Sequence, residues 1–201
     1  IALQYHEVKV ILQTTQVSTL AEANLWCDYI YLDTDERRRF AQVSHEYLIE
    51  QLQYESCTAS NGQDINFNHP VKELIWTGDW DGNQHADLTD STWQLKLNGH
   101  DRFAPRNIRY FTRTQVWQHH TGCGGLNAGT AGVGGAIVDR IAVYSFALKP
   151  EEHQPSGTCN FSRIDNAQMV TVGSVQDYNL YAINYNVLRI MSGMGGLAYS
   201  N

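Results

Sequence analysis

A glycine-rich segment at residues 122–135, GCGGLNAGTAGVGG, has the composition of a loop that could hold a phosphate group. Such a loop needs glycines that lead into a helix, usually with a lysine at the start of that helix. This segment contains no lysine and leads into a predicted strand, and the glycines within 193–196 fail the same test. We therefore interpret residues 122–135 as a surface loop rather than a nucleotide-binding site.

The histidines do not have the spacing of a metal site. His119 and His120 are adjacent, so on a strand their side chains would point to opposite faces. Enzymes of the cupin type bind metal through a His-x-His pair, and no such pair occurs here. His6, His100 and His153 lie near predicted turns and strand starts, where we expect structural hydrogen bonds. We predict no bound metal and no cofactor.

Nucleophilic chemistry is also not indicated. Ser162 and Asp165 could be combined with a histidine on paper, but nothing resembles a nucleophile elbow. We therefore predict that the chain is not an enzyme. The sequence Asn160-Phe161-Ser162 matches an N-glycosylation site, which makes Asn160 the one candidate for modification. We expect Asn160 to stay unmodified, because it begins a predicted core strand.

The four cysteines, Cys27, Cys57, Cys123 and Cys159, lie far apart and include no Cys-x-x-Cys pair. Zinc sites usually contain such pairs, and a disulfide framework usually shows closer spacing. Isolated reduced cysteines behave as small apolar side chains. We predict four free thiols.

Composition and charge narrow the class of protein further. The chain has 201 residues, 42% of them hydrophobic, with eleven Tyr and five Trp, which suits one β-rich domain with a sizeable core. Its formal net charge of −7 disfavours direct binding to nucleic acid. No window has the length and apolar character of a membrane-spanning helix.

The apolar patterns predict an all-β fold with little helix. We expect strands at 5–15, 25–32, 45–55, 70–77, 93–97, 137–148, 159–172 and 178–191. Residues 45–55 also fit a helix, because Val43, Tyr47, Leu48 and Leu52 have helical spacing. We expect short helices near 36–40, after an N-cap in the Asp33–Asp35 turn, and at 105–118.

The connections between these strands are predicted from their turn residues. Asn98-Gly99 follows an alternating strand and predicts a hairpin. The polar segments 56–69, 78–91 and 120–136 are expected at the ends of a sandwich rather than across its faces. Ile141–Leu148 is apolar on both faces, so we expect something beyond its own sandwich to cover it.

Four stretches carry a resemblance to a known family. They are SFALKPEEHQPSGTCNFSRIDNA at 145–167, ALQYHEVKV at 2–10, LNGHDRF at 97–103 and YNVLRIMSGMGGLAYSN at 185–201. Together they resemble the major capsid proteins of nucleocytoplasmic large DNA viruses, of the phycodnavirus, iridovirus and mimivirus type. The resemblance favours a strand at 45–55.

The resemblance implies a fold and a structural role. The fold would be an eight-stranded antiparallel jelly-roll sandwich with one or two short helices, the second half of a double jelly roll. Residues 1–201 would form this C-terminal jelly roll, and because the chain begins with Ile1 inside a predicted strand we expect more protein upstream.

The implied function is to build an icosahedral capsid in the virion. Three chains would form a homotrimer of pseudo-hexameric outline that contacts neighbouring capsomers and minor capsid proteins, with assembly in the host cytoplasm. The alternative is a carbohydrate-binding jelly roll, a lectin or cupin-like module in which Trp76, Trp80 and Trp93 stack on sugars. A cupin enzyme would need clustered metal ligands, and a lectin would bind glycans in an array.

Overall fold

The computed structural model describes residues 1–12, 23–58, 62–79, 88, 91–122, 139–173 and 176–199. These residues divide into two compact units. The first unit is Ile1–Leu48 with Val187–Ser200, and the second is Ile49–Asn186. The division passes through the two longest strands, β1 (His45–Cys57) and β10 (Tyr178–Met191), so each strand contributes to both units.

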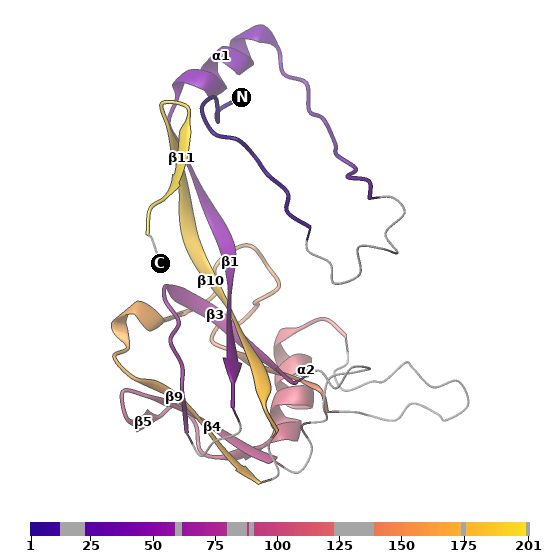
Figure 1. The fold of residues 1–201 in the computed structure, drawn as a ribbon, viewed down its shortest axis with the longest axis vertical. Coiled ribbons are helices and arrows are strands. Elements are labelled where there is room, and N and C mark those ends of the chain that lie inside the picture. The colour runs from indigo at the N-terminus through magenta and orange to yellow at the C-terminus, as the bar shows by residue number, and fades with distance from the viewer. Residues whose placement is uncertain are drawn as a thin grey trace, which may run out of the picture. The chain divides into compact units, whose positions relative to one another are not determined.

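Two antiparallel sheets contain all the strands of the described residues. The first sheet has six strands, four of them in the order β1-β10-β3-β7, while β8 pairs with β3 and β11 pairs with β10. Besides β1 and β10, its strands are β3 (Pro70–Gly78), β7 (Ile141–Ser145), β8 (Cys159–Asn160) and β11 (Met194–Leu197). The second sheet has five strands, four of them in the order β2-β9-β4-β5, while β6 pairs with β4. They are β2 (Gln63–Asp64), β9 (Ala167–Gly173), β4 (Ser91–Leu97), β5 (His100–Asp101) and β6 (Arg106–Asn107). Figure 1 shows β4, β5 and β9 side by side.

The core of the second unit lies between these sheets and is built around aromatic side chains. Trp76 of β3 and Trp93 of β4 are fully buried, with ring centroids 5.4 Å apart. Tyr178 of β10 meets Trp93 edge to face at 4.9 Å. Each such side chain contributes about 2–3 kcal/mol by leaving water. Contacts between the two sheets therefore fix β3, β4 and β10 as the frame of the unit.

The predicted hairpin after β4 is confirmed. Asn98 and Gly99 have φ angles of 51° and 77°, the left-handed pair that a tight β-turn requires. They join β4 to β5 with Leu97 opposite His100. The Asn98 side chain also accepts hydrogen bonds from the backbone N–H groups of Asp165 and Asn166 at 2.9 and 3.1 Å. The turn therefore also holds the start of β9.

A helical segment closes one side of the second unit. It consists of a π-helical turn, η2 (Tyr110–Thr114), and α2 (Gln115–His119), and it confirms the predicted helix in the second half of 105–118. Residues 106–107 instead form β6. Both helical pieces contact β7, and the Gln115 side chain accepts a hydrogen bond from the backbone N–H of Ser145 at 3.1 Å.

The expectation that Ile141–Leu148 needs a cover from outside is wrong for most of this run. The four residues 142–145 are buried within the unit, between 0% and 9% exposed. Only Ile141 and Leu148, at the two ends, are exposed, by 56% and 73%. The apolar character of β7 is satisfied because η2 and α2 lie against it.

The first unit holds the predicted short helix, α1 (Thr34–Gln42). Asp33 accepts a hydrogen bond from the Glu36 N–H, and the Glu36 side chain accepts one from the Asp33 N–H, a complete capping box. None of the α1 residues is buried. The same unit contains the β10–β11 hairpin, which turns at Ser192 and Gly193 with positive φ.

Two predicted strands of the first unit are wrong. Residues 6–12 and 25–32 belong to no ladder, and residues 13–15 lie outside the described part. Their apolar side chains face solvent: Val8 is 76% exposed and Trp26 92%. Alternation of side chains predicts a strand only where a partner can bond to it, and the described residues offer none to these segments.

Other predictions need smaller corrections. The strand expected at 159–172 is broken into β8, a 3-10 turn η3 (Phe161–Arg163) and β9. The polar loop expected at 56–69 contains β2, and its Ile65 and Phe67 are core residues only 4% and 6% exposed. The described residues hold eleven strands, several of only two residues, against the eight predicted. Most of 78–91 and 120–136 lies outside the described residues.

Candidate functional site

A closed loop at residues 146–157 lies at the centre of the polar contacts in the second unit. Its two ends are joined by the Lys149 N–H, which donates to the Ser156 hydroxyl at 2.9 Å, and by the Leu148 N–H, which donates to the Ser156 carbonyl at 3.4 Å. Gly157 has a φ of 144°, and a Cβ there would lie 2.7 Å from the Phe146 carbonyl oxygen. The loop therefore requires glycine at its closing position.

A buried lysine holds this loop from β3. Lys72 is 3% exposed, and its ammonium donates to Glu50 Oε1 of β1 at 2.7 Å and to the Pro150 carbonyl at 2.6 Å. The ring of Tyr185 lies 5.6 Å from the same nitrogen. A buried charge is stable only when it is paired and hydrogen-bonded. Lys72 therefore ties β1, β3 and the 146–157 loop together.

The next residue of β3 makes a second connection. Glu73 is 4% exposed, and its Oε2 lies 3.0 Å from His120 Nε2. The other ring nitrogen of His120, Nδ1, lies 3.1 Å from Glu151 Oε1 in the loop. Glu151 also accepts hydrogen bonds from the N–H and hydroxyl of Thr121. We call Glu73, His120 and Glu151 the histidine bridge.

The two carboxylates of the histidine bridge are perturbed in opposite directions. Burial raises the pKa of Glu73, and the nearby His120 and Lys72 charges oppose this rise. Hydrogen bonds from Thr121 lower the pKa of Glu151, which is a surface residue. The bridge therefore joins a carboxylate that resists ionisation to one that ionises readily.

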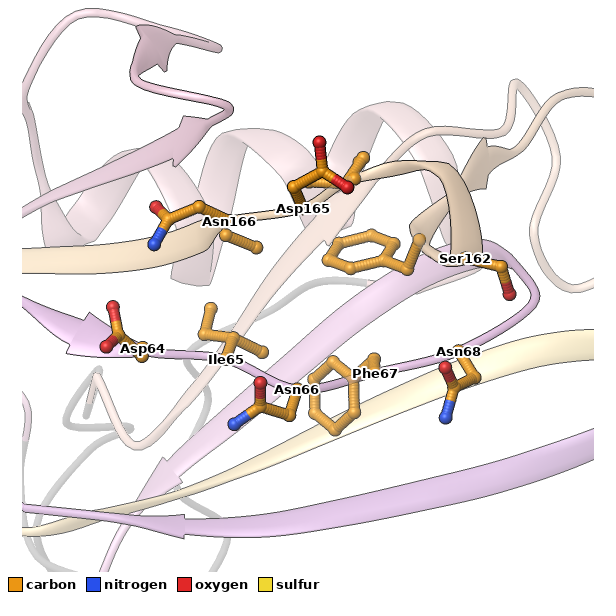
Figure 2. Close-up of a pocket in the computed structure, with 11 residues that line it drawn as sticks. Asp64, Ile65, Asn66, Phe67, Asn68, Ser162, Asp165 and Asn166 are labelled. Carbon is orange, nitrogen blue, oxygen red and sulfur yellow. The ribbon is translucent and has the colours of Figure 1, made fainter.

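A separate pocket of about 410 Å³ lies between residues 64–68 and 161–167 (Figure 2). Its lining includes the polar side chains of Asp64, Asn66, Asn68, Asp165 and Asn166 and the buried rings of Phe67 and Phe161. Among the described residues that line the pocket there is no Lys, Arg or His to neutralise an anionic ligand.

The pocket also lacks the features of a sugar site or a catalytic site. Phe67 and Phe161 are only 6% and 3% exposed, so their ring faces are not available for stacking. The Asp64 carboxylate is held by the Gln168 amide at 2.7 Å. These observations point to a structural recess between two segments.

The residues that the sequence singled out are scattered across the structure. His6 accepts a hydrogen bond from the Gly195 N–H at 3.2 Å, as expected for a structural role. His100 lies exposed in β5, and His153 is exposed 3.9 Å from Glu50. In the described part of the chain no group of three or more His, Cys, Asp or Glu side chains is placed to hold a metal ion.

Asn160 of the glycosylation sequence and Ser162 of the considered catalytic triad make structural contacts instead. Asn160 Oδ1 accepts a hydrogen bond from the Ser162 N–H at 3.1 Å. The Ser162 hydroxyl accepts one from the backbone N–H of His69 at 2.8 Å. Both side chains therefore hold the β3–β8 junction, and modification of Asn160 stays an untested prediction.

The structure describes three of the four cysteines, and four free thiols in the assembled protein stay a prediction. Cys27, Cys57 and Cys159 are free thiols, and Cys123 lies outside the described residues. Burial raises the pKa of Cys57 to about 11. No described helix is long and apolar enough to cross a membrane.

The histidine bridge was missed by sequence reasoning. Its members are 31 to 78 positions apart, from Glu73 to His120 and Glu151, and no local spacing connects them. One signal was present: Lys72 and Glu73 stand next to each other inside an otherwise apolar strand. Charges in such a strand indicate a buried partner.

Comparison with known proteins supplies the family. A family model described as large eukaryotic DNA virus major capsid protein matches residues 36–196. The major capsid protein of Pyramimonas orientalis virus is 53% identical over all of this chain and 57% of its own length. That of Paramecium bursaria Chlorella virus 1 is 38% identical over all of this chain and 62% of its own length.

A solved structure of a capsid protein is similar to this chain as well. The PBCV-1 VP54 structure fitted into a reconstruction of the virophage Sputnik matches with a TM-score of 0.69 and 36% identity, over 86% of this chain and 56% of that one. This match confirms the predicted antiparallel jelly-roll fold. The chain thus spans about three fifths of the length of these relatives. By the extent of the family match and the identity to these relatives, the chain belongs to the large eukaryotic DNA virus major capsid proteins.

Proposed function

We propose that this chain is a structural part of an icosahedral viral capsid. The observation that carries the proposal is the family match over residues 36–196, together with the jelly-roll second unit. A shell subunit acts through extended surfaces, and a stable jelly-roll fold can supply such surfaces.

The exposed apolar surface of the first unit supports self-association. Nine large apolar side chains in two unpaired segments are between 68% and 92% exposed: Val8, Val10, Ile11, Leu12, Leu25, Trp26, Tyr29, Ile30 and Tyr31. Stretches of exposed large apolar side chains commonly mark sites of protein–protein contact. We propose that further parts of the longer protein and its neighbours in the shell cover these segments.

The assembly we propose follows the family pattern. The second unit would be the C-terminal jelly roll of a double jelly roll, with another jelly roll upstream. Three chains would close a homotrimer of pseudo-hexameric outline, which contacts neighbouring capsomers and minor capsid proteins. The location would be the virion, after assembly in the host cytoplasm. The net charge of −7 argues against direct contact with the packaged nucleic acid.

We also propose that the chain has no catalytic activity. Two groups of polar side chains in the second unit, Lys72 with Glu50 and the histidine bridge, are engaged in tying the loop at 146–157. A third, Asp139, accepts hydrogen bonds from Thr112 and Arg113. Two of the three tryptophans named for the carbohydrate-binding alternative, Trp76 and Trp93, are core residues that cannot stack on a sugar, and Trp80 lies outside the described residues.

Negative-stain microscopy of the purified full-length protein tests this function. We expect uniform particles with a six-sided outline. Dispersed single subunits at high protein concentration, together with micromolar binding in a glycan array, would favour the carbohydrate-binding alternative.

A further inference from the structure

We propose that the histidine bridge is a pH-dependent latch that holds the loop at 146–157 against α2 and β3. The inference rests on the geometry of Glu73, His120 and Glu151 in the second unit and does not depend on the capsid role. Its consequence is that loss of one proton from the bridge releases the loop while the two sheets stay intact.

The first step is the donor and acceptor count. Both ring nitrogens of His120 face carboxylate oxygens, at 3.0 Å on the Glu73 side and 3.1 Å on the Glu151 side. An ionised carboxylate only accepts, so a ring that satisfies both sides must carry a proton on each nitrogen. A neutral ring would turn one lone pair toward a carboxylate, and that contact is repulsive.

The second step is that few groups other than His120 can compensate the charge of the buried Glu73 carboxylate. Its Oε2 is buried and makes no well-aligned hydrogen bond, so the nearby ring charge of His120 is its main compensation. The ammonium of Lys72 also acts on Glu73 but is engaged by Glu50 and Pro150. When His120 is neutral, the carboxylate of Glu73 is left buried beside a lone pair.

The third step is what the bridge connects mechanically. His120 is the residue that ends α2, and its N–H donates to the Val116 carbonyl. Glu151 lies in the loop, and Glu73 lies on β3 in the middle of the first sheet. Next to the bridge, the His119 ring lies 3.1 Å from the Leu148 carbonyl. One imidazole therefore joins a helix end, a loop and a strand.

The remaining charged groups around the bridge are few. Glu50 and His153 lie on the far side of Lys72, with His153 Nδ1 3.9 Å from Glu50. His153 is 71% exposed, so its charge is screened by water. Among the described residues, Lys72, His119 and Tyr185 are further titratable groups near the bridge, and burial raises the pKa of Tyr185, with a smaller rise from the charges of Glu50 and Glu73.

The direction of the pH effect follows from these groups. The contact between Glu73 and His120 needs one proton, and burial raises the pKa of Glu73 because an ionised Glu73 without that proton is costly. The stability that this proton supplies is fully present below the ordinary Glu73 value of 4.5 and is lost as pH rises through the raised value. The pKa of Glu151 is lowered, so its contribution disappears only as pH falls through that lowered value. The latch is therefore closed in mildly acidic solution and opens as pH rises.

Hydrogen exchange of the full-length protein tests the proposal. The Thr121 N–H donates directly to Glu151, and the Leu148 and Lys149 N–H groups close the loop, so these amides report on the latch. Rates are corrected for the intrinsic pH dependence of exchange and compared from about pH 5.5 to about pH 8, where histidine titrates. We expect protection of these amides to fall by about tenfold, the effect of losing one charge-assisted hydrogen bond. Amides of β4 should show no such step.

Substitutions separate the latch from general loosening. H120Q should abolish the pH step, because the side chain that links Glu73 to Glu151 can then no longer gain or lose a proton. E73Q should also abolish the pH step, but the loop should stay protected over the whole pH range. The glutamine amide can donate a hydrogen bond to one nitrogen of a neutral His120 ring, while the other nitrogen donates to Glu151. H153Q is the matched control, an exposed histidine of the same loop, and should keep the step.

The outcomes decide the proposal. Absence of a step in the unmodified protein overturns it, and so does a step that persists in H120Q or E73Q. Low loop protection in E73Q at both ends of the pH range also overturns it. Exchange in β4 monitors the folding of each variant, so a variant that fails to fold is recognised, and the other then carries the test.

Discussion

Replacing Gly157 with alanine should destabilise the second unit more than the same replacement at Gly62. Both glycines have a positive φ, 144° and 131°, in a region that side chains rarely adopt. They differ in what a new Cβ would meet. At Gly157 it would lie 2.7 Å from the Phe146 carbonyl oxygen and 3.3 Å from the Ala147 Cα, whereas at Gly62 no atom of the described residues lies within 4 Å.

The expected loss in the free energy of unfolding has two parts. A positive φ costs an alanine about 1–2 kcal/mol at either site. The Gly157 variant must also move backbone atoms that β3 holds, since the Phe146 and Ala147 N–H groups both donate to the Lys72 carbonyl. Forcing such a shift in a packed region costs about 1–3 kcal/mol more. That difference corresponds to roughly 2–12 °C in melting temperature for a chain of this size.

The assay is urea unfolding of the full-length protein and the two variants, followed by tryptophan fluorescence. The midpoint should fall further for G157A than for G62A, with the slope unchanged in both. Equal midpoints for the two variants would refute the reasoning, because they would show that the loop at 146–157 relaxes without cost.

Three further predictions concern buried groups. D139N should cost about 1–3 kcal/mol in urea unfolding, because the buried Asp139 accepts hydrogen bonds from Arg113 at 3.0 and 2.8 Å. Because the pKa of Asp139 is lowered, native stability should decline as pH falls below its ordinary value of 3.8, and this decline should be smaller in D139N. K72M should cost about 2–4 kcal/mol by the same measurement, since it leaves the Glu50 carboxylate without its ammonium, and E50Q combined with K72M should regain part of the loss. Cys57, 1% exposed and with its pKa raised to about 11, should react with iodoacetamide only on unfolding, and rapid labelling of the native protein would contradict its burial.

The strands that the sequence predicted correctly are those whose signals are local and strong. The dense apolar run of β3, the alternation of β10 and the Asn98-Gly99 turn all form as expected. The segment 45–55 forms β1, although its spacing alone fitted a helix equally well. The resemblance decided that case, because periodicity could not.

The failures have a common physical cause, which is that a strand is defined by its partner. Residues 6–12 and 25–32 have strand-like patterns but no ladder, while the polar segment 62–68 turns out to alternate Ile65 and Phe67 into the core. In the same way, β7 needs no outside cover because a helix distant in sequence packs against it. These pairings depend on tertiary contacts that a single sequence does not display.

The histidine bridge could not be found from spacing. It is made by three elements that meet only in the folded second unit, and His120 was considered as a metal ligand rather than as a link between carboxylates. The charged pair Lys72-Glu73 inside β3 was the usable clue. Two adjacent buried charges must each have a partner, and both partners lead to the loop at 146–157.

The mass of the full-length protein in solution tests the capsid role most directly. Size-exclusion chromatography with light scattering should give three times the mass of one chain, because the exposed apolar side chains of segments 1–12 and 23–33 require covering surfaces. The segment 1–201 expressed alone should aggregate for the same reason. A stable, monodisperse monomer of the full-length protein across the accessible concentration range would contradict the proposed shell subunit.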